Sequence, residues 1–146
     1  AMANIVDMAL LRHLRENSRE HLTKISRAYG IPVTTLVAAL VRVKANFVTN
    51  FTTLVDLSKL GFGIKAGFVI AVKDKKAKRE LEKHLLSSLN TNNVSRLSGE
   101  YEFLVDAFFR DVKELYLFEE GLRGFQIAKF EQIHFVEELA CEKFVP

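Results

Sequence analysis

Basic side chains are concentrated in the first third of the sequence, on both sides of Gly30. The first 50 residues carry seven lysines and arginines against three acidic residues, whereas the rest of the chain carries fourteen against fifteen. Lysine and arginine bind phosphate oxygens, and such contacts fix a protein on a nucleic-acid backbone without identifying its bases. For each of them the alternative is an ordinary solvated helix surface. The candidates for phosphate contact are Arg19, Lys24, Arg27, Arg42 and Lys44.

Two segments with helical periodicity would position these cations. Residues 22–29 repeat apolar side chains at helical spacing, and residues 33–44 do so again with Leu36, Leu40 and Val43. A tight turn between crossed helices needs a residue that accepts positive φ, and the intervening glycine supplies it. The pattern predicts a helix-turn-helix, whose second helix enters the major groove of DNA. The alternative is a helical hairpin without a nucleic-acid role.

The second of these helices would present small side chains to the bases. Thr34, Thr35, Ala38 and Ala39 are predicted to face the base edges. Alanine and the methyl group of threonine can touch the methyl group of thymine. The alternative is that the two alanines are present only as good helix formers.

The flanking segments complete a small N-terminal domain. An amphipathic helix is predicted over Ile5–Glu16, and it would supply the third side of a three-helix core. The residues at 46–51 favour a strand, and a strand directly after the third helix would form a wing. We therefore expect a winged helix-turn-helix DNA-binding domain over residues 1–52, followed by a linker over residues 53–62.

The remainder of the chain, residues 63–146, shows an alternating pattern of strands and helices. The order is β-α-β-β-α-β, which predicts a ferredoxin-like domain and an α+β fold class for the chain. Both faces of the third strand are apolar, so we expect the face of the sheet without helices to pack on another subunit. The tail after residue 135 could form an extra strand or a docked segment. The predicted strands cover residues 64–72, 92–97, 101–109 and 125–135, and the helices cover residues 74–89 and 111–122.

Several classes of function lack support in the sequence. The four histidines have no partner at metal-ligand spacing, no glycine-rich phosphate loop is present, and adjacent glutamate pairs lie on exposed segments, so we expect no cofactor, no metal and no enzymatic activity. The longest apolar runs are too short to span a bilayer, so no membrane partner is expected. The single cysteine, Cys141, excludes an internal disulfide framework and is typical of a reducing cytoplasm.

The order of these motifs resembles the Lrp/AsnC family of transcription regulators, also called feast/famine regulators. Leu10-Leu11 and Leu14 are similar to its opening helix, Gly30-Ile31 to its turn, and Gly99-Glu100-Tyr101-Glu102 to its hairpin between the central strands. The similarity extends from Val6 to about Val136. It implies a C-terminal RAM/ACT-like domain, a homodimer that assembles further into an octamer, duplex DNA as partner, and an amino-acid effector. By this resemblance the effector site would consist of Ser98, Gly99, Glu100, Tyr101 and Glu102.

Three departures from the family pattern concern the recognition of bases. Pro32 stands where the family usually has a serine helix cap, and Ala38 and Ala39 stand where it often has longer polar side chains. The turn after the recognition helix is also one residue shorter. An alternative function is therefore an Lrp-like effector-binding or assembly protein with weak or lost DNA readout. Sirohaem decarboxylases have a similar fold, but the histidine expected before the hairpin turn is absent from residues 94–98.

Overall fold

The computed structural model describes residues 2–146, which form two compact units. The first unit covers the chain up to Leu54 together with Ala140–Pro146, and the second covers Val55–Leu139. Each unit has its own hydrophobic core. Among the described residues no single helix is long and apolar enough to cross a membrane. In the described chain, Leu22–Tyr29 and Val33–Asn46 reach that length and composition only when taken together, and they are bent by 113° at their junction.

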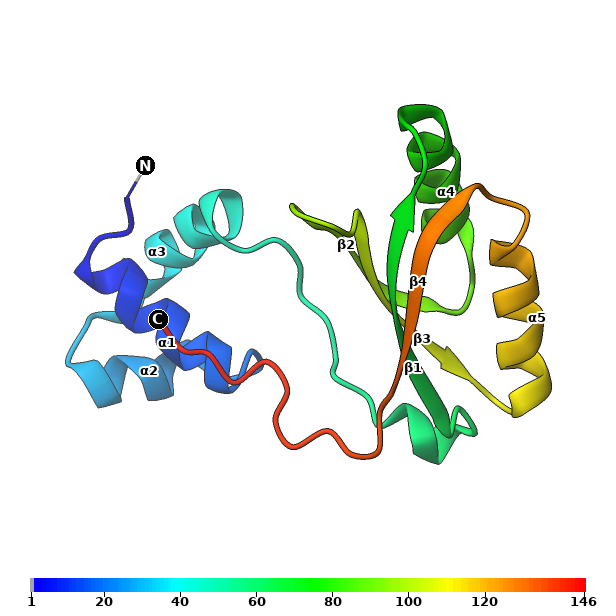
Figure 1. Cartoon of the computed structure of the whole chain (residues 1–146). Helices are drawn as coiled ribbons and strands as arrows, with labels where there is room; N and C mark the ends of the chain where they lie inside the picture. The colour runs from blue at the N-terminus through cyan, green and yellow to red at the C-terminus, as the bar shows by residue number, and fades with distance from the viewer. Residues whose placement is uncertain (1) are drawn as a thin grey trace. The chain divides into compact units, whose positions relative to one another are not determined.

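The first unit is a bundle of three helices: α1 (Ile5–Glu16), α2 (Leu22–Tyr29) and α3 (Val33–Asn46) (Figure 1). A capping box starts α1, because the Asn4 side chain accepts from the Asp7 backbone while the Asp7 carboxylate accepts from Asn4. Gly30 ends α2 at φ +64°, in the left-handed conformation that the predicted turn requires. The fully buried side chains come from all three helices: Leu10, Ile25, Leu36, Ala39 and Val43.

The predicted wing strand is absent, and this part of the prediction was wrong. The third helix continues to Asn46, and no strand is formed between residues 47 and 56. The backbone amides of Phe47 and Val48 both donate to the Val43 carbonyl, so they close the end of α3 instead of pairing with a strand. Their side chains pack against the three-helix core. The β-forming residues of this segment thus end a helix, because no neighbouring strand offers them a ladder.

The C-terminal tail belongs to the first unit, although we expected it to continue the second domain. The backbone carbonyl of Pro146 accepts from Arg12 Nε at 2.7 Å, and that of Phe144 accepts from Arg15 Nε at 2.9 Å. Arg15 also pairs with Glu142 at 2.7 Å. Of the two alternatives for the tail, a docked segment on α1 is therefore the one that the structure contains.

The second unit has the predicted ferredoxin-like order. A short 3₁₀ helix, Leu57–Leu60, precedes an antiparallel sheet of strand order β2-β3-β1-β4. Asp74 and Asp111 start the two helices by accepting from the backbone amides three residues on. The elements are β1 (Ile64–Val72), α4 (Lys75–Ser87), β2 (Thr91–Arg96), β3 (Phe103–Phe109), α5 (Val112–Leu122) and β4 (Ile127–His134).

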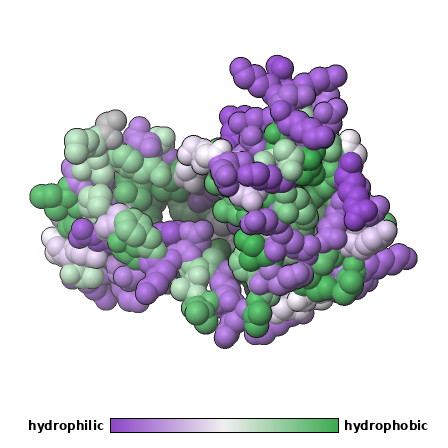
Figure 2. Space-filling view, viewed as in Figure 1, coloured by the Kyte–Doolittle hydropathy of each residue, from purple (hydrophilic) through white to green (hydrophobic). Residues whose placement is uncertain are grey.

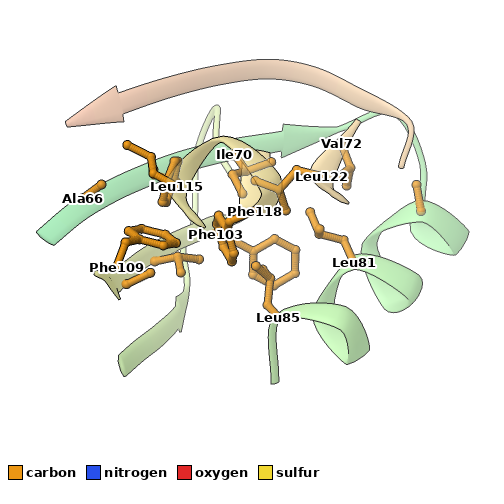
Figure 3. Close-up of a cluster of buried hydrophobic side chains, with 14 residues drawn as sticks. Ala66, Ile70, Val72, Leu81, Leu85, Phe103, Phe109, Leu115, Phe118 and Leu122 are labelled. Carbon is orange, nitrogen blue, oxygen red and sulfur yellow. The ribbon is translucent and has the colours of Figure 1, made fainter. Parts of the chain in front are cut away.

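Both helices of this unit cover the same face of the sheet. Alternate residues of β1 and β3, such as Phe68 and Phe103, point toward Leu81 on α4 and Phe118 on α5. Figure 3 shows the side chains of this core, among them Leu81, Phe103 and Phe118, gathered between the strands and the helices. The opposite face has no helix of this unit on it. The fold class predicted from the sequence, α+β with a helical N-terminal part and a ferredoxin-like part, is therefore confirmed.

Candidate nucleic-acid interface

The outward face of α3 is mostly apolar. The inward face is formed by Leu36, Ala39 and Val43, which are fully buried. The opposite side of the helix presents a stripe at helical spacing, which we call the α3 stripe, and all of its members are exposed. The valines on it are 49% and 67% exposed. The α3 stripe consists of Thr34, Val37, Ala38, Val41 and Ala45.

The predicted base-facing set is therefore corrected at two points. Ala39 is fully buried in the three-helix core, so it cannot reach a base. Thr35 is exposed but lies toward the edge of the outward face, about 100° around the helix from Thr34. Val37 and Val41 lie on the exposed face and are not in the predicted set. Counting three and four residues from Thr34 would have found them, because that spacing defines one face of a helix.

Arg42 is held within the protein by Asp7. The guanidinium donates to one carboxylate oxygen of Asp7 from Nη2 at 2.6 Å and from Nε at 3.2 Å. The Asp7 side chain is only 4% exposed, and this pair joins the first turn of α1 to the last turns of α3. The hydrogen bond from Arg42 lowers the pKa of Asp7 below its ordinary value, despite the opposing effect of burial. Arg42 thus fixes the position of α3, which differs from the phosphate contact that its sequence position suggested.

Lys24 is also paired, but its ammonium group stays accessible. It lies 2.8 Å from the Glu20 carboxylate, four residues earlier, and its side chain is mostly exposed. This hydrogen bond lowers the pKa of Glu20. The attraction of Lys24 for an external anion is therefore reduced by a nearby negative charge.

The remaining three cations of the predicted set have no acidic partner. Within residues 2–146, Arg19 and Arg27 make no ion pair, and Lys44 lies 5.3 Å from the centre of the exposed Phe51 ring. A cation–π contact at an exposed site is weak, so Lys44 can exchange it for a phosphate. No aspartate or glutamate occurs between residues 21 and 55. The surface formed by α2, its turn and α3 is therefore free of fixed negative charge from its own segment.

The predicted effector hairpin lies in the second unit. Gly99 has φ +113°, so a positive backbone angle is required there. Glu100 pairs with Lys129 on β4 at 3.3 Å. A hydrogen bond to the Glu131 carboxylate, with burial and the charge of that carboxylate, raises the pKa of Tyr101. Ser98 stands beside Gly99 in an irregular turn between β2 and β3.

Glu102 differs from its predicted role in that hairpin. Its carboxylate accepts from the backbone amide of Val72 at 2.8 Å, and its own amide donates to the Ile70 carbonyl. The side chain therefore ties the start of β3 to the end of β1 and is already engaged.

The face of the sheet without helices combines apolar and charged groups. Leu104, Ile133 and Phe135 are each between 42% and 43% exposed there. Lys65 lies on the same face, 3.7 Å from Asp106 and 3.1 Å from Glu138. Neither on this face nor in the rest of the described chain is a group of three His, Cys, Asp or Glu side chains arranged to hold a metal ion.

Comparison with known proteins gives consistent results. No family model matches the chain. An uncharacterized helix-turn-helix-type transcriptional regulator of Pyrococcus furiosus is 28% identical over 121 residues, covering 81% of this chain and 78% of the relative. A regulator described in the same words from Pyrococcus horikoshii is 24% identical over 140 residues, covering 95% and 94%.

Solved structures of transcriptional regulators superpose on this chain. A transcriptional regulator of Neisseria meningitidis, solved in complex with L-Met, superposes with a TM-score of 0.89 at 18% identity and covers 99% of this chain and 97% of its own. Escherichia coli AsnC superposes with a TM-score of 0.87 at 17% identity over the full length of both chains. The chain thus has the fold of AsnC and is similar in sequence to helix-turn-helix-type transcriptional regulators.

Proposed function

We propose that this regulator binds duplex DNA by placing α3 in the major groove, with the α3 stripe against the bases. The observation that supports this most strongly is the absence of any acidic residue between residues 21 and 55, around an exposed helix flanked by cations. DNA repels fixed negative charge at close approach, and ordinary solvated helices mix acidic with basic residues. An acid-free helical hairpin of this length is therefore suited to a polyanion.

Arg19, Arg27 and Lys44 are the phosphate contacts of this proposal. Lys24 contributes less because Glu20 accompanies it, and Arg42 acts indirectly through Asp7 by holding α3 in place. A dimer would then neutralise about six phosphates, and the logarithm of the binding constant would fall with the logarithm of salt concentration at a slope of about −5.

The proposed active form is a homodimer that packs through the face of the sheet without helices. The exposed side chains of Leu104, Ile133 and Phe135 support this, because large apolar groups on one side of a sheet gain from being covered. Two α3 helices about 34 Å apart would then reach half-sites one helical turn apart. Further assembly into an octamer is proposed from the family resemblance. Light scattering should give a dimer or larger for wild type, and Leu104→Glu should dissociate it while Leu86→Glu, on exposed α4, should not.

An amino-acid effector is a second candidate function. The Neisseria regulator was solved with L-Met, and this favours an amino acid as the class of ligand to test here. The proposed site is the hairpin with Ser98, Gly99, Glu100 and Tyr101, with Glu102 supporting the backbone. Calorimetry with each of the twenty amino acids would test it. A ligand that binds wild type but not Tyr101→Phe would support the site, and silence across the whole set with an intact oligomer would contradict it.

Salt-dependent DNA binding is the decisive test of the main proposal. Fluorescence anisotropy with a labelled duplex from upstream of its own coding sequence should show binding that weakens steeply from 50 to 200 mM salt. Arg27→Ala and Lys44→Ala should each weaken it. Lys113→Ala is the control, because Lys113 is an exposed lysine on α5 that makes no ion pair within residues 2–146. A DNA affinity that changes neither with salt concentration nor with the first two substitutions would contradict the proposal and favour an assembly protein that has lost DNA readout.

A further inference from the structure

The composition of the α3 stripe is unusual for a helix surface in water. Val37 and Val41 are 49% and 67% exposed, and Ala38 and Ala45 lie beside them. Valine is not favoured in helices, because its branched side chain loses rotational freedom there. An exposed helix face is ordinarily polar. Neither helix formation nor solvation therefore explains these valines, whereas a contact that covers them would.

The α3 stripe has almost no capacity for hydrogen bonds. Thr34 carries its only hydroxyl group. Thr35, Arg42 and Lys44 lie at its edges, with Arg42 already bound to Asp7 and Lys44 over the Phe51 ring. In the major groove, guanine, adenine and cytosine are distinguished by donors and acceptors. Thymine alone presents an apolar group there, its 5-methyl. The chemistry of the stripe thus matches one feature of the groove and lacks the groups needed for the others.

The dimensions of the stripe fit a short series of base pairs. From Val37 to Val41 the helix rises about 6 Å, close to two base-pair steps of about 3.4 Å. Branched methyl groups at both positions, with Ala38 between them, provide a continuous apolar surface over that length. Arg27 and Lys44 lie on the same helical hairpin and provide the charge that holds it against the backbone.

We propose that α3 selects DNA by contact between the α3 stripe and the 5-methyl groups of pyrimidines, so that thymine and 5-methylcytosine are favoured over uracil and cytosine. This inference rests on the proposed DNA binding and adds its basis of selection. Phosphate contacts determine how tightly the protein binds, and Val37, Ala38 and Val41 determine where. The selected feature is a methyl group, which distinguishes this mode from readout by hydrogen bonds.

Four alternating copolymers test the inference without knowledge of an operator. They are poly(dA-dT), poly(dA-dU), poly(dG-dC) and poly(dG-5-methyl-dC), each as a duplex, titrated against the full chain by competition anisotropy. Within each pair the phosphates and hydrogen-bonding groups are the same, and only the 5-methyl differs. Burial of one methyl group favours binding by about four-fold, so two contacts give a preference of about ten-fold or more. The methylated member of each pair should bind more tightly.

A double substitution assigns the preference to the stripe. Val37→Thr with Val41→Thr keeps the side-chain shape and replaces one methyl by a hydroxyl at two exposed sites, so folding is retained. The thymine-to-uracil ratio should fall, because each site loses one of its two methyl groups, while the salt slope stays the same. Val112→Thr is the matched control, because Val112 is 70% exposed on α5. It should leave the ratio unchanged.

Three results would overturn the inference, and they differ from one another. Equal binding to each pair with a steep salt slope would remove methyl selection and leave the proposed DNA binding intact. No binding to any duplex would overturn both together. A thymine preference that the double substitution leaves undiminished would assign the stripe to another contact. A simultaneous fall of the molar mass in light scattering would identify that contact as one with a second copy of this chain.

Discussion

Helices α3 and α4 are similar in length but present opposite surfaces to solvent. The α4 helix carries five exposed or half-buried cations, and hydrophilic side chains gather over it in Figure 2. The outward face of α3 is apolar with few charges. Charge density alone would select α4 as the nucleic-acid surface. The cations of α4 are Lys75, Lys76, Lys78, Arg79 and Lys83.

The placement of acidic residues distinguishes the two helices. On α4, Glu80 follows Lys76 by one turn and Glu82 follows Lys78 by one turn, so the field of the lysines is partly cancelled at the surface. Lys78 contributes to the lowered pKa of Glu82, whose main cause is the hydrogen bond from Arg96. Between residues 21 and 55 no acidic residue occurs, and only Lys24 and Arg42 are compensated, by Glu20 and Asp7. A few uncompensated cations beside a surface that can enter a groove form a better DNA site than many compensated ones.

Truncation of one buried leucine in each helix should give the largest losses of stability. It should also separate the role of α3 in DNA binding from the role of α4 in the sheet unit. Leu36 on α3 and Leu81 on α4 are both fully buried, and replacing either with alanine should cost about 2–5 kcal/mol of stability. Leu36→Ala should abolish DNA binding, because it loosens the unit that holds α3. Leu81→Ala should lower the melting temperature of the sheet unit and weaken DNA binding less. Circular dichroism melts with anisotropy titrations would check this, and the reverse order of DNA-binding losses would refute the assignment.

Removing two cations at once from α3 and its preceding helix, or from α4, should give the next largest difference in DNA binding. Arg27→Ala with Lys44→Ala takes away about four phosphate contacts per dimer, so DNA binding at 0.1 M salt should weaken on the order of 100-fold or more and the salt slope should flatten to about −2. Lys75→Ala with Lys76→Ala removes as many charges from α4 and should leave the slope nearly unchanged. Equal losses from both pairs would show that α4 binds DNA as strongly as α3 does.

The turn before α3 should respond to a smaller change. Gly30 has φ +64°, so alanine there should cost about 1–2 kcal/mol through backbone strain alone. A built Cβ at Gly30 meets no atom within 4 Å, so crowding is not the cause. Gly63, which precedes β1, also has open space and has no positive φ, so Gly63→Ala should change stability little. Denaturant titrations of the two variants would test the contrast, and similar losses in both would argue against strain.

The pH dependence of the first unit should give the smallest signal. Asp7 has a folded-state pKa below its ordinary 3.8, mainly because of Arg42. Its contribution to stability is therefore complete above the unfolded value and is lost as pH falls below 3.8 toward the folded value. Asp7→Asn should remove this part of the acid sensitivity, so that the variant loses less stability than wild type between pH 5 and about 2. Parallel acid-denaturation curves would indicate that the pair contributes nothing.

The predictable parts of the fold depended on local signals. The predicted and observed ranges of the first helix are the same, Ile5–Glu16, because its apolar periodicity is regular and Asn17 ends it. The first strand was predicted within its bounds, Ile64–Val72, and Asp111 was identified as the cap of α5. Each signal lies within a few residues of the element that it specifies. The ferredoxin-like order followed from these elements and was confirmed.

Most of what the sequence did not reveal depends on partners that are distant in sequence. The residues after α3 favour a strand, but strand formation needs a neighbouring strand, and none is present there. Arg42 looked free until Asp7, 35 residues earlier, was placed beside it. Glu102 was assigned to a ligand, whereas its partner is the backbone of Val72. Ala39 was predicted to face outward, but it lies on the inward side of α3 between Leu36 and Val43.

The acid-free hairpin also defines how this protein should tolerate mutation. Aspartate or glutamate at exposed α3 positions such as Ala38, Val41 or Ala45 displaces no buried group, so a library selected for folded protein should retain these variants. A library selected for repression or activation in cells should lose them, because each adds a negative charge beside the DNA backbone. The difference between the two libraries would outline the DNA-contacting surface residue by residue, without a structure of the complex.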